Sequence, residues 1–92
     1  PQEEAIPPLE HAKESLMLGL RLKEGVDVGA VERRTGLNLW PSLRPAALSL
    51  AEGGFLEIEG LRLKPTRRAF PLLHGVVLKL WEALEASTHR RM

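Results

Sequence analysis

The sequence predicts a mainly α-helical domain with a small β-hairpin, in a winged-helix-like order of three helices, a hairpin and a long final helix. Apolar residues recur three and four positions apart near both ends of the chain, which is the spacing of one helix face. Over residues 56–64, apolar and charged residues alternate instead, as they do along half-buried strands. Glycines separate these segments, at positions 25, 36, 53 and 54.

The first helix is expected over about Leu9–Lys23, after a proline-bearing linker at residues 1–8. Gly25 follows the last apolar position, where a residue with positive φ is expected. Gly19 lies inside this helix, where glycine costs about 1 kcal/mol relative to alanine. We therefore expect another backbone, from the third or fourth helix, to approach closely there. The apolar face consists of Leu9, Ala12, Leu16 and Leu20.

Two shorter helices are expected next. Asp27 is suited to cap the second helix through its side chain, with Val26 and Val31 at the positions of a hydrophobic staple. Gly36 ends that helix. The third helix is expected over about Ser42–Glu52, and its apolar side consists of Leu43, Ala47, Leu50 and Ala51.

The hairpin is expected to turn at Glu59-Gly60, because glycine tolerates the positive φ of tight turns. On one of its faces, Glu57 lies opposite basic neighbours. The apolar residues alternate along the two strands, at Leu56 and Ile58 and at Leu61 and Leu63.

The final helix is expected over about Thr66–Ala86, and residues 87–92 are expected to fray, so that the folded domain spans residues 9–86. Pro71 either kinks the first turn of this helix or marks its true start. The apolar stripe consists of Leu73, Val77, Leu80 and Leu84, widened by Phe70, Val76 and Trp81.

Composition excludes several classes of function. The chain has 92 residues, a net charge of +1 and no cysteine, so it forms no disulfide, thiolate iron–sulfur cluster or cysteine-based zinc site. Nearly balanced charge gives no global attraction to nucleic acid or anionic lipid. No stretch approaches the roughly 20 apolar residues of a membrane span, and the N-terminus has no secretory signal pattern. We expect a cytoplasmic location and no membrane partner.

No catalytic, cofactor-binding or metal site is predicted in this chain. The histidines, His11, His74 and His89, share no metal-ligand spacing. The serines lack an elbow motif, and Gly53-Gly54 is an isolated turn signal rather than a phosphate loop.

We expect no nucleic-acid partner, although winged helices often bind DNA. The predicted third helix offers one arginine, two serines and one acid, which is a poor supply for reading base edges. The residues available for phosphate contact near the hairpin are Arg33, Arg34, Arg62, Lys64, Arg67 and Arg68.

Residues 14–27, ESLMLGLRLKEGVD, closely resemble the opening of the C-terminal domain of oxygen-independent coproporphyrinogen III oxidases and their haem-chaperone relatives. The resemblance continues through the short helix ending at Gly36, through LAEGGFL at residues 50–56 and through LRLKPT at residues 61–66, and covers residues 9–84. Ala69 and His74 depart from it, since the family usually has Gly and Asn there.

This resemblance implies a parent protein with an upstream radical-SAM barrel, whose three cysteines hold a [4Fe–4S] cluster that cleaves S-adenosylmethionine. It also implies that the parent acts on porphyrin or haem, and that this domain packs on the barrel and helps cover the substrate site. Two alternatives stay open: a winged-helix DNA-binding or protein-interaction module, and a haem-binding fragment that uses a histidine. The resemblance does not separate the oxidase branch from the haem-chaperone branch.

The first helix carries two leucines away from its core stripe. Leu18 and Leu22 are four residues apart, and at 100° per residue they point away from the stripe that contains Leu16 and Leu20. Together with Arg21, they are the predicted domain-docking surface.

Overall fold

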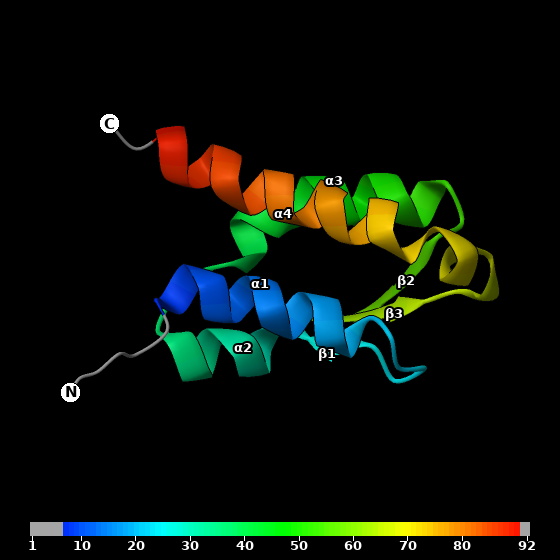
Figure 1. Ribbon diagram of the computed structural model, residues 1–92, viewed down its shortest axis with the longest axis horizontal. Coiled ribbons are helices and arrows are strands. Elements are labelled where there is room, and N and C mark those ends of the chain that lie inside the picture. Colours follow the sequence, from blue (N-terminus) through cyan, green and yellow to red (C-terminus); the bar gives the residue numbers. More distant parts are fainter. Residues whose placement is uncertain (1–6, 91–92) are drawn as a thin grey trace.

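The computed structural model describes residues 7–90 and confirms a mainly α-helical fold with a small antiparallel sheet (Figure 1). In chain order the elements are α1 (Pro8–Gly19), β1 (Val26–Asp27), α2 (Val28–Thr35), α3 (Trp40–Glu52), β2 (Leu56–Glu59), β3 (Arg62–Pro65), the 3-10 helix η1 (Arg67–Leu72) and α4 (Leu73–Arg90).

The helices form two pairs around one core. Helix α1 packs against α2, and α3 packs against α4. The two pairs meet where α1 and α4 run side by side (Figure 1). The sheet closes one end of the core. The fully buried leucines come from α1, the turn after it, α3, β3 and α4, and they are Leu16, Leu20, Leu43, Leu63 and Leu80.

Helix α1 ends at Gly19, not near Lys23 as predicted, because the chain turns there to bring residues 25 and 26 back against the helix. A Cβ atom on Gly19 would lie 2.7 Å from the Cβ atom of Val26. The predicted close approach at Gly19 is therefore real, but the approaching backbone is the segment entering β1 and not a third or fourth helix.

Strand β1 was missing from the sequence prediction. It has two residues, paired antiparallel with β3 as Val26↔Leu63 and Asp27↔Arg62, so the sheet has three strands in the order β1-β3-β2. Two residues are too few to show an alternating pattern. Gly25 has a φ of +76°, and a Cβ atom there would lie 2.0 Å from the carbonyl oxygen of Leu63, so only glycine fits.

The predicted caps of α2 are confirmed. The Asp27 carboxylate accepts a hydrogen bond from the backbone N–H of Ala30 at 3.2 Å, and Gly36 ends the helix with a φ of +76°. Helix α3 begins at Trp40, two residues before the predicted start. At its start, Glu32 Oε2 from α2 accepts hydrogen bonds from the backbone nitrogens of the N-cap residue Leu39 and of Trp40, each at 2.8 Å.

The hairpin turns at Gly60-Leu61, one residue later than predicted, because Glu59 pairs with Arg62. Gly60 has a φ of +61° and Leu61 has no positive φ, so glycine occupies the first central position, as in a type II′ turn. Leu61 consequently lies outside the strand and is exposed. Glu57 lies opposite Lys64, as expected.

The final helical segment divides at Pro71. Residues Arg67–Leu72 form the 3-10 helix η1, and α4 starts at Leu73, because proline cannot donate the N–H bond that an α-helix needs. The predicted stripe is buried at Val76, Val77, Leu80 and Leu84. Phe70 instead lies in η1 and is 40% exposed.

Both predicted termini of the domain shift outward. Helix α1 already includes Pro8 of the expected linker, and α4 continues to Arg90, beyond the expected end at Ala86. Residues 1–6 of the predicted linker and the last two residues of the predicted tail lie outside the described residues.

We predict that Glu32→Ala lowers the free energy of unfolding by about 1–2 kcal/mol, because it removes both acceptor bonds at the start of α3. In a domain of this size, each kcal/mol corresponds to roughly 4–8 °C in the melting temperature, measured by circular dichroism. Glu82→Gln is the matched control, since Glu82 is exposed on α4. Equal melting curves for the two variants would contradict the capping role of Glu32.

Candidate docking surface

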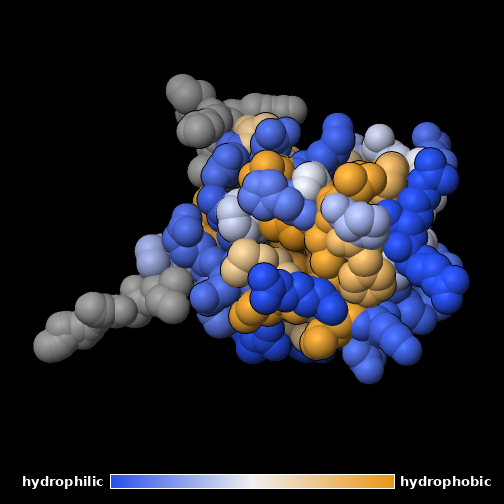
Figure 2. Space-filling model, turned by 45° about the vertical axis from the view of Figure 1, so that its right-hand side comes forward, coloured by the Kyte–Doolittle hydropathy of each residue, from blue (hydrophilic) through white to orange (hydrophobic). Residues whose placement is uncertain are grey.

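Large hydrophobic side chains reach the surface in several separate places. Figure 2 shows one face of the molecule, where hydrophobic patches are bordered by hydrophilic side chains. Among the described residues the exposed large hydrophobics are Leu18, Leu22, Leu48, Leu61, Phe70, Leu72 and Leu78. Two of the predicted docking residues belong to this set.

Leu18 and Leu22 lie in a groove between α1, β1 and α2, which we call the α1–α2 groove. It encloses about 350 Å³, and Leu18 and Leu22 on its wall are 52% and 56% exposed. Arg34 from α2 crosses its edge and donates a hydrogen bond to the Ser15 hydroxyl at 3.5 Å. These two leucines are therefore not part of the domain's own core.

Arg21 lies elsewhere. It follows the end of α1 and lines a second groove of about 180 Å³, which we call the α1–α4 groove. The other residues of this groove are Met17, Leu73, His74, Val77, Leu78 and Trp81. The three residues that the sequence placed on one surface are thus divided between two grooves on either side of α1.

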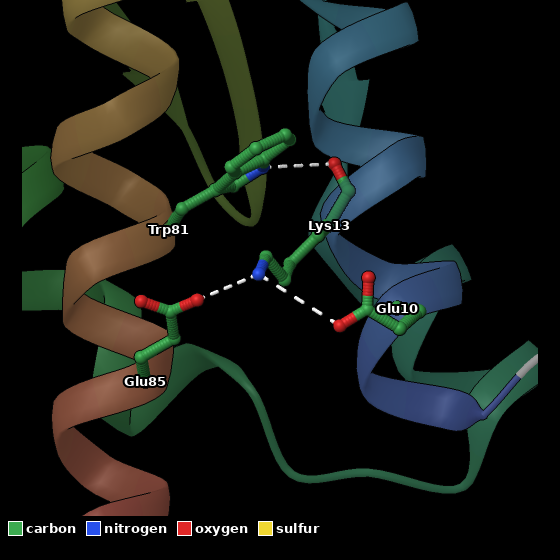
Figure 3. A network of polar contacts seen from close by, with 4 residues as sticks. All are labelled: Glu10, Lys13, Trp81 and Glu85. Atoms are coloured by element: carbon green, nitrogen blue, oxygen red, sulfur yellow. Dashed lines mark hydrogen bonds and ion pairs between the residues drawn. The ribbon is translucent and has the colours of Figure 1, made fainter.

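A polar network joins α1 to α4 beside the α1–α4 groove (Figure 3). The Lys13 ammonium donates to Glu85 Oε2 at 2.6 Å, lies 3.8 Å from Glu10 Oε2 and sits 5.0 Å from the ring centre of Trp81. The Trp81 indole N–H donates to the Lys13 carbonyl oxygen at 3.0 Å. The contacts between α1 and α4 could not be predicted from the sequence, because Lys13 is 68 residues from Trp81 and 72 residues from Glu85 and no local pattern links them.

The hydrogen bond to Glu85 is the main cause that raises the pKa of Lys13 above its ordinary value of 10.5. The nearby Glu10 carboxylate acts in the same direction, while partial burial of the ammonium acts against it. The Lys13 side chain is only 14% exposed, whereas the Glu85 side chain is 47% exposed. The charged form of Lys13 is thus stabilised by folding.

The histidines lie apart from one another. His11 is half-buried on α1, His74 is exposed and lines the α1–α4 groove, and the side chain of His89 lies outside the described residues. Among residues 7–86, whose side chains the structure describes, no three His, Asp or Glu side chains gather where they could hold a metal ion. A separate observation is that no helix in this part of the chain is long and apolar enough to cross a membrane.

The basic residues near the hairpin are largely engaged within the domain. Arg62 lies 3.9 Å from Asp27, Lys64 lies 3.4 Å from Glu59, and Arg68 stacks over the Phe55 ring at 5.3 Å. The exposed side of α3 carries Pro41, Arg44, Pro45, Leu48, Ser49 and Glu52. This arrangement gives no specific support to base readout in a DNA groove.

Comparisons with known proteins gave one match. A family model described as the HemN C-terminal domain matches residues 6–72. No curated protein and no solved structure matches the chain.

We predict that the network around Lys13 makes stability depend on alkaline pH. Because folding raises the pKa of Lys13, its contribution is complete below pH 10.5 and is lost as the pH rises through the higher, folded-state pKa. Melting temperatures between about pH 9 and pH 12 should fall more steeply for the unchanged chain than for Glu85→Gln. The prediction would be contradicted if the melting temperatures of the unchanged chain and of Glu85→Gln fell in parallel with pH. It would also be contradicted if the control Glu82→Gln gave a curve as shallow as that of Glu85→Gln.

Proposed function

Because the chain belongs to the HemN C-terminal domain family, we propose that it is the non-catalytic accessory domain of a radical-SAM protein of the oxygen-independent coproporphyrinogen III oxidase type. The family match covers most of the chain, from α1 to the end of η1. The chain has no cysteine, so the [4Fe–4S] cluster and S-adenosylmethionine of such a protein belong to its upstream barrel domain. The parent acts on porphyrin or haem in the cytoplasm.

The accessory role is to pack on the barrel and help cover its substrate site. The observation that carries this proposal is the pair of leucines in the α1–α2 groove, Leu18 on α1 and Leu22 in the turn after it, which are both more than half exposed. Contacts between domains of one chain typically bury about 600–1,500 Å², and apolar side chains at the centre of such a contact supply most of its stability. Arg21 lines the separate α1–α4 groove, so we do not include it in this contact.

We predict that this chain alone acquires no iron–sulfur cluster. Reconstitution with iron and sulfide under reducing conditions should give no absorbance of a [4Fe–4S] cluster, because thiolate ligands are absent. S-adenosylmethionine should also stay uncleaved. A stoichiometric cluster on this chain would contradict the accessory role.

We further predict that Leu18→Ser combined with Leu22→Ser has little effect on the isolated chain but weakens docking in the parent protein. In the isolated chain, the free energy of unfolding should change by less than about 1 kcal/mol, because both side chains are already exposed. In the parent protein, the same change should weaken domain docking, seen as faster release of the domain by limited proteolysis.

The matched control is Leu48→Ser combined with Leu61→Ser, which changes two exposed leucines outside both grooves. This pair should leave proteolytic release unchanged. If the Leu18 and Leu22 changes unfold the isolated chain, those leucines belong to its own core. If both pairs release the domain equally, the α1–α2 groove is not the docking surface.

A further inference from the structure

A continuous surface runs along the seam between α1 and α4. The α1–α4 groove adjoins a wider hollow of about 330 Å³, and the two share Met17 and Trp81 in their walls. We call the combined surface the α1–α4 seam. Its first half is mainly apolar, lined by Leu73, Val77 and Leu78. Its second half lies over the charged network of Figure 3.

The two ends of the α1–α4 seam differ in charge. Arg21 and His74 line the apolar half, which has no acidic residue in its wall, whereas Glu10 and Glu14 line the other half. Within the described residues, Arg21 and Glu14 form no hydrogen bond or ion pair. Lys13, which lines the same half as Glu14, is already bound to Glu85. The seam therefore offers an unpaired cation at one end and an unpaired carboxylate at the other.

The wall between these two charges is fixed before any ligand arrives. The Trp81 indole is held by its hydrogen bond to the Lys13 carbonyl and by the ammonium over its ring. A wall that does not have to be ordered on binding favours affinity, because less side-chain entropy is lost. Met17 lies beside it with a flexible thioether that adapts to different apolar shapes.

The size of the apolar half limits what it can hold. Its volume of about 180 Å³ is below the roughly 300–1,000 Å³ of typical small-molecule sites. It suits one large apolar side chain of the kind that anchors protein–protein contacts. Glu14 lies five residues, roughly 8 Å, before the last residue of α1, and Arg21 lies two residues beyond the end of that helix, so about three residues of an extended peptide would span the two charges.

We propose that the α1–α4 seam binds a polypeptide segment in which an aromatic or branched apolar side chain lies between an acidic and a basic residue. The apolar side chain enters the groove beside Leu78 and Trp81. The acidic residue pairs with Arg21, and the basic residue pairs with Glu14. This site is separate from the α1–α2 groove and does not rest on the proposed accessory function.

The test is a titration of the nitrogen-15-labelled chain with the peptide acetyl-Glu-Gly-Trp-Gly-Lys-amide, followed by NMR. Amide shifts should concentrate at Met17, Arg21, His74 and Leu78, with a Kd on the order of 1 mM. Replacing the peptide's Glu by Gln should weaken binding about two- to fivefold, as expected for an exposed ion pair. Replacing its Trp by Ala should abolish the shifts.

Variants of the chain identify the contacts. Arg21→Gln should bind the Glu and Gln peptides equally, because the charge pair is then absent from both complexes. Arg34→Gln, an exposed arginine at the α1–α2 groove, should keep the preference for Glu. The proposal is overturned by absence of binding at about 10 mM peptide, by shifts centred on Leu18 and Leu22, or by an Arg21→Gln variant that retains the preference.

Discussion

The geometry of this domain depends on the close passage of the chain at Gly25 against strand β3. The space there admits no side chain, since a Cβ atom would overlap the Leu63 carbonyl. Because the backbone can pass so closely, Val26 and Asp27 pair with β3, and Asp27 is brought into position to cap α2. Gly19 allows the same segment to pack against the end of α1. Two glycines thus join α1, α2 and the sheet into one unit, and they leave Leu22 on an exposed turn.

The contacts between Lys13 and Trp81 join the unit of α1, α2 and the sheet to α4. The charged and aromatic contacts that hold the two helices together also form the rigid wall of the α1–α4 seam. Helix α1 therefore connects the α2 side of the domain to the α4 side. One side of it is buried in the core, and its two remaining sides open into grooves whose chemistry differs: exposed leucines on the α2 side, and an apolar pocket between opposite charges on the α4 side.

Sequence patterns predicted features that depend on residues close together in the chain. The Asp27 cap, the end of α2 at Gly36 and the buried stripe of α4 follow from helix periodicity and local hydrogen bonding. The pattern could not predict β1, because a two-residue strand exists only through its partner. It placed the hairpin turn one residue early, since both registers put Gly60 in the turn. Arg21 was grouped with Leu18 and Leu22 because it is close to them in the sequence. Only the packing of α4 beside α1, which the sequence pattern does not show, places Arg21 in another groove.

We propose above that this domain docks on a larger protein through the α1–α2 groove, which contains Leu18 and Leu22. Hydrogen–deuterium exchange, measured by mass spectrometry on the isolated chain and on the intact parent, tests this most directly. The account predicts slower exchange in the parent over residues 17–25, where several turn amides have only local hydrogen bonds, and unchanged exchange at the hairpin turn around Gly60. Equal exchange over residues 17–25 in both proteins, with protection confined to the hairpin or η1, would contradict it.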